Sequence, residues 1–151
     1  MKWSLVLCFG ISLVLVSCAS FQPTQPKGFA PFKSKTFASD FRAMSPEGIT
    51  WRISAEEHKP KADLAFWKPA LRKRMTEAGY RIVDSLSFEA SGQKGWALEL
   101  AAPLGQSDYS YLVAIIPCDK DLILVESSGT VADFAKRKSE ILATLANIQA
   151  K

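Results

Sequence analysis

The sequence predicts an α+β fold, in which two helices cover a mostly antiparallel six-stranded sheet. Apolar residues alternate with polar ones in several short segments, and they recur at helical spacing in two others. The connections between the strands are short and rich in turn residues, which favours antiparallel pairing. The expected element order is β-β-α-β-β-β-β-α.

A first hairpin is expected from a strand at residues 37–41, the turn Ser45-Pro46-Glu47-Gly48 and a second strand. In that second strand Ile49, Trp51 and Ile53 point one way and polar residues point the other. This is the alternation of a half-buried strand.

A helix is predicted over residues 63–78, because one apolar stripe runs along it and Gly79 is placed to end it. The stripe consists of Leu64, Trp67, Leu71, Met75 and Ala78. Pro69 removes one backbone hydrogen bond, so either the helix kinks there or its regular part starts near Trp67.

A second hairpin joins residues 80–90 to residues 96–101 through a turn at residues 91–95. Residues 109–116 and 122–125 are apolar on both faces and rich in β-branched side chains. Strands of that kind lie in the middle of a sheet.

The last helix is expected to begin after Thr130, which forms a capping-box pattern with Asp133. Its apolar stripe consists of Val131, Phe134, Ile141, Leu145 and Ile148. Because the central strands hide both faces, the fold is either a three-layer sandwich or a sheet with its second face against another subunit.

The N-terminus carries an export signal, with Lys2 followed by an apolar run at residues 5–16. The run ends in Leu15-Val16-Ser17-Cys18, which resembles the lipobox of the bacterial lipoprotein family. The resemblance implies that signal peptidase recognises Leu15, Val16 and Ser17, and that Cys18 becomes the lipidated N-terminus. A membrane-spanning helix needs about 20 apolar residues, more than this run offers; an ordinary signal peptide cut elsewhere is the other alternative.

Three segments follow from this prediction: a signal peptide at 1–17, a lipidated N-terminus and Pro-rich tether at 18–35, and one domain at 36–151. Removing the signal from the 151 residues leaves 134, a usual length for a single domain. The phenylalanines of the tether either dip into the membrane interface or dock on the domain; they are Phe21, Phe29 and Phe32.

The lipoprotein resemblance also bears on location. In that family an aspartate directly after the lipidated cysteine favours retention in the inner membrane, and this chain has Ala19 there. The resemblance therefore implies a lipid anchor in the outer membrane, facing the periplasm, with the inner membrane as the alternative.

The net charge and the number of cysteines limit the classes of function that are possible. The net charge of +4 falls to +3 in the mature chain, because Lys2 is the one charged residue of the signal. That excess is too small to indicate nucleic-acid binding. With Cys8 removed and Cys18 lipidated, Cys118 has no cysteine partner, and a place in the core is favoured over availability to a partner.

The mature region resembles the small α/β sandwiches of the PsbP-like class, which includes bacterial envelope lipoproteins of the DcrB type, over most of residues 35–150. The resemblance lies in the element order and in the stretch from Asp108-Tyr109-Ser110-Tyr111 through residues 122–129 into the last helix. It implies a non-enzymatic accessory protein.

We expect no catalytic residues, no metal and no cofactor. His58 is the single histidine and lies in a polar connection, where a solvated side chain is expected. Asp119 and Asp121 fit a hairpin tip better than a calcium loop. Glu126 follows an apolar strand and is expected to cap a backbone group or to pair with Arg or Lys.

Four aromatic residues, Trp51, Trp96, Tyr109 and Tyr111, form the possible ligand or partner surface. The first functional hypothesis is a membrane-anchored, non-enzymatic envelope lipoprotein that contacts another envelope protein. The alternative is a periplasmic carrier or sensor for a small apolar ligand, for which the aromatics would wall a cavity. Neither the pathway nor the oligomeric state follows from the sequence.

Overall fold

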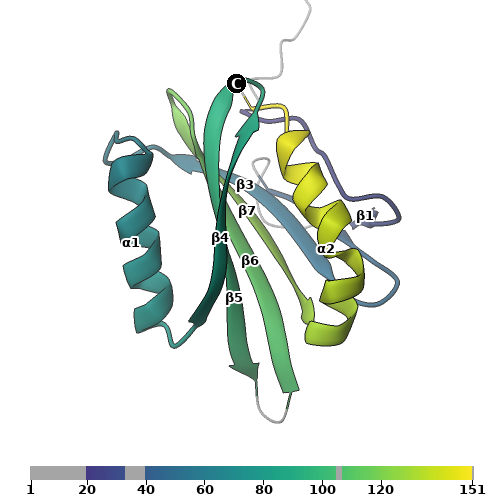
Figure 1. Cartoon of the computed structure of the whole chain (residues 1–151). Coiled ribbons are helices and arrows are strands. Elements are labelled where there is room, and N and C mark those ends of the chain that lie inside the picture. The colour runs from purple at the N-terminus through teal and green to yellow at the C-terminus, as the bar shows by residue number, and fades with distance from the viewer. Residues whose placement is uncertain (1–19, 33–39, 105–106, 151) are drawn as a thin grey trace, which may run out of the picture.

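The structure is a computed structural model and describes residues 20–32, 40–104 and 107–150. Seven strands and two helices make up this part of the chain (Figure 1). The strands are β1 (Ala30–Phe32), β2 (Asp40–Met44), β3 (Thr50–Glu57), β4 (Arg81–Ala90), β5 (Gln93–Leu104), β6 (Ser107–Pro117) and β7 (Asp121–Thr130). The helices are α1 (Leu64–Glu77) and α2 (Val131–Ala146).

All seven strands form one antiparallel sheet in the order β1-β2-β3-β7-β6-β5-β4. The predicted number of six strands is wrong, because β1 adds a strand at one edge. This strand has three residues, and Pro31 lies at its centre. Three residues show no readable alternation, so composition alone indicated a tether here.

The strands that the sequence placed in the middle of the sheet, β6 and β7, do lie there. They are joined by a tight connection at residues 118–120, in which the Cys118 N–H donates to the Asp121 carbonyl at 2.9 Å. The β4–β5 turn is shorter than expected and contains Ser91 and Gly92 alone, both with positive φ. That conformation matches the twist of a two-residue hairpin.

The two helices lie on opposite faces of the sheet, which gives three layers (Figure 1). Helix α2 buries Phe134, Ile141 and Leu145 against one face. Helix α1 packs Leu71 against Trp96 and Leu98 on the other face. The three-layer alternative is thus the one that the fold adopts.

Helix α1 is regular through Pro69. The Asp63 carboxylate caps its start by accepting the N–H groups of Ala65 and Phe66, at 2.9 and 3.2 Å. It ends at Glu77 with Ala78 as the C-cap, and Gly79 follows with a φ of +89°. A later start near Trp67 is therefore excluded.

Residues 20–32, expected as part of a tether, lie against the domain. Phe21 and Phe29 are 6% and 5% exposed and belong to the core under α2, whereas Phe32 is 44% exposed. The Trp51 indole N–H donates to the Thr24 carbonyl at 2.7 Å. The segment thus supplies part of the third layer, and of the two alternatives for these phenylalanines, docking holds for Phe21 and Phe29.

Because Phe21 and Phe29 fill the core, Phe29→Ala should lower the free energy of unfolding by about 3 kcal/mol. Phe32→Ala is the matched control, and its exposed ring should contribute less than about 1 kcal/mol. Urea unfolding of both variants measures the difference. Equal losses would show that the segment does not contribute to the core.

Candidate functional site

Helix α1 covers only part of its face of the sheet. It lies over β4 and β5 and beside the first residues of β7, where Leu122 and Leu124 belong to its apolar cluster. The same face of β1, of β2, of residues 50–54 in β3 and of residues 126–128 in β7 has no helix above it. We call this region, together with the adjoining part of β6, the open sheet face. Its side chains are Phe32, Asp40, Arg42, Met44, Thr50, Arg52, Tyr111, Glu126 and Ser128.

A charged network crosses the middle of the open sheet face. The Arg52 guanidinium donates to Asp40 at 3.0 Å and to Glu126 at 2.7 Å. Arg42 holds Asp40 from the other side at 2.9 Å, and the Tyr111 hydroxyl donates to Glu126 at 2.5 Å. The expectation that Glu126 pairs with a basic residue is confirmed, and the network joins four adjacent strands.

The surroundings of this network favour the ionised forms of Asp40 and Arg52 and the protonated form of the Tyr111 hydroxyl. Burial opposes the charge of Asp40, but hydrogen bonds from Arg42 and Arg52 outweigh it and hold its pKa below the ordinary value. Burial also opposes the charge of Arg52. Its hydrogen bond to Asp40 and the charge of Glu126 outweigh burial and raise the pKa of Arg52. Burial, and then Glu126, raise the pKa of Tyr111, so its hydroxyl remains a donor.

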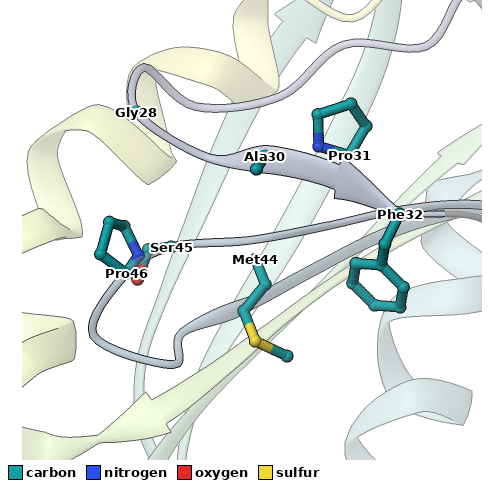
Figure 2. Close-up of a pocket in the computed structure, with 7 residues that line it drawn as sticks. All are labelled: Gly28, Ala30, Pro31, Phe32, Met44, Ser45 and Pro46. Carbon is teal, nitrogen blue, oxygen red and sulfur yellow. The ribbon is translucent and has the colours of Figure 1, made fainter.

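An apolar rim borders the network. Figure 2 shows Phe32 and Met44 extending from adjacent strands to the same side, with Pro31 pointing away. They line a shallow groove of about 450 Å³ together with Gly28, Ala30, Pro31, Ser45 and Pro46. Phe32 and Met44 are 44% and 41% exposed, among the most exposed large apolar side chains of the described residues.

A second groove runs between α1 and the sheet. It measures about 410 Å³, and its apolar wall consists of Phe66, Trp67, Ala70, Leu71, Ile115, Leu122 and Leu124. The polar residues of its lining are Glu56, Glu57, Lys59 and Arg74.

The four aromatics proposed as one surface lie on both sides of the sheet. Trp51 is buried in the core under α2, whereas Trp96 is buried on the α1 face, where Lys68 and Arg72 cover its ring at 5.7 and 5.2 Å. Tyr111 reaches the open sheet face, and Tyr109 shares its side of β6 by alternation. The prediction that all four aromatic residues could wall a single cavity is therefore wrong. The sequence shows that these residues are aromatic, but the face of the sheet on which each one lies depends on strand register.

The residues that sequence reasoning missed are Asp40, Arg42 and Arg52. The alternation in β3 placed Arg52 on the side opposite Trp51, and that side was interpreted as plain solvent-facing surface. The signal for its role is the cross-strand pairing of Arg42, Arg52 and Glu126, which depends on the neighbouring strands and not on local sequence.

His58 is buried, so the expected solvated side chain is a wrong prediction. Its Nε2 lies 3.1 Å from the Trp67 indole nitrogen, 3.2 Å from the Ala62 backbone nitrogen and 2.8 Å from the Ala62 carbonyl oxygen. Its Nδ1 lies 2.6 Å from the Cys118 carbonyl oxygen. This arrangement braces the loop before α1 against the β6–β7 turn.

Cys118 is buried at 4% exposure, as favoured from the sequence. Burial, and then the charges of Asp121 and Asp119, raise the pKa of its thiol. Because the thiolate is the reactive form, this cysteine is poorly reactive in the folded protein.

The described residues lack two further features. No group of three or more His, Cys, Asp or Glu side chains there could hold a metal ion. Nor does that part of the chain contain a helix with the length and hydropathy needed to cross a bilayer. The lipobox residues Leu15, Val16, Ser17 and Cys18 lie outside the described residues.

The architecture defines the class of α+β sandwiches with one antiparallel sheet between two helices. No protein-family model matches the sequence, and no curated protein matches it. Among solved structures, cyanobacterial PsbP (CyanoP) from Synechocystis sp. PCC 6803 is similar with a TM-score of 0.62 at 14% identity, over 90% of this chain and 95% of that chain. PA94, a protein of unknown function from Pseudomonas aeruginosa, is similar with a TM-score of 0.59 at 11% identity, over 78% and 94%.

The chain therefore adopts a PsbP-like fold, as the sequence resemblance implied. At such low identities the likeness shows the fold alone, because one fold serves many unrelated functions.

The lowered pKa of Asp40 predicts a pH-dependent contribution to stability. The ion pairs of Asp40 stabilise the fold fully above its unfolded pKa, near 3.8, and that contribution is lost as the pH falls through the lower folded pKa. Asp40→Asn should thus be less stable than the wild type at pH 7, and the difference should shrink below about pH 4.

Urea midpoints of both proteins from neutral to acidic pH measure this effect. The matched control is Asp108→Asn, which alters an exposed carboxylate of β6 and should change the midpoint little at any pH. A difference between wild type and Asp40→Asn that is constant with pH would contradict the prediction.

Proposed function

We propose that the protein is a membrane-anchored envelope lipoprotein that binds another envelope protein through the open sheet face and catalyses no reaction itself. The lipid on Cys18 holds it to the periplasmic face of the outer membrane; the inner membrane is the alternative location. The support for the anchor is the sequence Leu15-Val16-Ser17-Cys18 after a charged and then apolar N-terminus.

One observation carries the binding surface. Phe32 and Met44 are exposed beside Arg42 and Arg52, on a sheet face that no helix covers. Protein interfaces are enriched in aromatic residues, Met and Arg, and the residues that dominate their affinity are surrounded by contacts that exclude water. The open sheet face has this composition.

The charged network prepares that surface for binding. Arg52 is already held between Asp40 and Glu126, so binding would cost little additional side-chain entropy. The two arginines of the network balance its two carboxylates. A partner that fits this face therefore has to match positive charges, negative charges and the apolar rim. Such a pattern favours specificity over general attraction.

Anchoring supports the same function. Each buried methylene contributes about 0.8 kcal/mol, and two or more acyl chains hold a protein stably on a bilayer. A partner anchored in the same membrane then meets the domain at a raised effective concentration, without any new contact.

Crosslinking in intact membranes tests the binding surface, with captured partners identified by mass spectrometry. Removing two apolar contacts with Phe32→Ala and Met44→Ala together should reduce the captured partner at least about tenfold, since each contact contributes of the order of 1 kcal/mol or more. Val83→Ala is the matched control, because Val83 is 51% exposed but lies on β4 at the far edge of the sheet. Equal capture from both variants would refute the open sheet face as the binding surface.

The same cells test the anchor. Wild-type protein should incorporate labelled palmitate and fractionate with the outer membrane, whereas Cys18→Ala should incorporate none and lose the association. Unchanged fractionation of Cys18→Ala, with no palmitate on the wild type, would refute the lipoprotein assignment.

The groove beside α1 favours a second candidate, a carrier or sensor of a small apolar ligand. Its volume of about 410 Å³ lies within the range of small-molecule sites, and most of the residues that line it are apolar. This groove, and not the four aromatics expected from the sequence, is the place where such a ligand would fit.

Filling the groove tests this candidate. If it binds apolar ligands, the fluorescent probe phenylnaphthylamine should bind the wild type, and Ala70→Trp should abolish binding because the new side chain occupies the groove. Ala143→Trp, on the exposed side of α2, is the control and should leave binding intact. A probe that binds neither protein, or both variants equally, would reject the carrier.

A further inference from the structure

The N-terminal segment is fixed to one end of the domain from its first described residue. The Ser20 hydroxyl donates to the Asp121 carboxylate, and Phe21 forms a β-bridge with Ala150. The Gln22 N–H donates to the Gln149 carbonyl at 3.0 Å. Phe21 is 6% exposed, so this attachment is part of the core and not a loose surface contact.

Cys18 precedes Ser20 by two residues. Consecutive Cα atoms are 3.8 Å apart, so the Cα atom of Cys18 lies within about 7.6 Å of that of Ser20 in any conformation. A lipid on Cys18 is therefore attached next to this end of the domain, whereas a free 18-residue tether would allow the domain to turn in any direction.

We propose that the lipidated protein stands on the bilayer in one orientation, with this end toward the lipid. We call it the membrane-proximal end; it consists of residues 20–22, 57–63, 91–94, 118–121 and 147–150, and it is the end marked C in Figure 1. The inference rests on the proposed lipid anchor and deepens it, because it assigns the surface that faces the membrane.

Hydrogen bonds between its loops make this end rigid enough to set an orientation. The His58 N–H donates to the Lys120 carbonyl at 3.2 Å, and the His58 ring holds the Cys118 carbonyl. The Ser91 hydroxyl donates to the Ile148 carbonyl at 3.1 Å. His58 thus joins residues 57–63 to residues 118–121, and Ser91 joins residues 91–94 to residues 147–150. Residues 20–22 connect the two pairs through Asp121 and Ala150.

The charges of this end do not themselves attract it to anionic lipid. Its lysines are Lys59, Lys61, Lys94 and Lys120, and its carboxylates are Glu57, Asp63, Asp119 and Asp121. Two of these lysines pair with carboxylates of the same end, Lys59 with Glu57 at 2.5 Å and Lys61 with Asp119 at 3.6 Å. The orientation follows from the acyl chains and the short link, and it should not depend on anionic headgroups.

The orientation decides where the open sheet face points. β7 starts at the membrane-proximal end with Asp121, and Glu126 lies five residues further along it, about 17 Å at the usual rise of a strand. The charged network and the rim of Phe32 and Met44 then stand clear of the headgroups. A partner reaches them from the aqueous side.

Depth-dependent fluorescence quenching tests the orientation in the full-length, lipidated protein. The background carries Cys118→Ser, and a fluorophore is attached to Lys120→Cys at the membrane-proximal end or to Glu47→Cys in the β2–β3 turn at the opposite end. In vesicles that contain a headgroup-region quencher lipid, the Lys120→Cys label should be quenched several-fold more strongly than the Glu47→Cys label. The result should be the same in phosphatidylcholine with and without phosphatidylglycerol.

A flexible Gly/Ser insertion between Ala19 and Ser20 is the control that isolates the link. It retains the lipid, and the two labels should become equally quenched. Equal quenching without the insertion, or an unequal pattern that survives it, overturns the inference.

Palmitate labelling of each protein separates the two proposals. Palmitate on Cys18 together with equal quenching of the two labels overturns the orientation alone. Absence of palmitate overturns the proposed anchor, and the orientation with it.

Discussion

The two central strands, β6 and β7, are apolar on both faces, so both faces of the sheet have to be covered for the domain to fold. The described part of the chain offers only two helices for this, and α2 alone does not cover its whole face. Phe21 and Phe29 complete it from the N-terminal segment. The burial requirement of the central strands therefore explains why a Pro-rich segment, which could have been a free linker, is bound to the domain.

The other face is covered differently. Helix α1 crosses from β3 to the far edge of the sheet and lies over β4 and β5, where Leu71, Trp96 and Leu98 pack together. The part of this face that it leaves uncovered carries two arginines and two carboxylates, which pair with one another across β2, β3 and β7. The exposed apolar side chains of Phe32 and Met44 lie beside them. One half of this face is thus covered by the packing of α1. On the other half the charged side chains pair with one another, and that half remains accessible.

Much of the fold was predictable from the sequence. The hairpins, the two helices, the antiparallel pairing and the central place of β6 and β7 all follow from alternation and helical stripes that are local in sequence. His58 and Trp51 show where such reasoning ends, because both are held by segments distant in the chain: His58 by Cys118, and Trp51 by Thr24. The site on the open sheet face depends on register across β2, β3 and β7, which no single segment specifies.

By itself the sequence determined the order of the elements from β2 to α2 and the helix cap at Thr130, because each depends on residues close together in the chain. Only the tertiary structure decided that residues 20–32 join the core, that Trp51 and Trp96 face opposite layers, and that Arg42, Arg52, Asp40 and Glu126 meet. The physical reason is that these contacts join residues far apart in sequence, and their geometry exists only once the sheet has fixed the register of its strands.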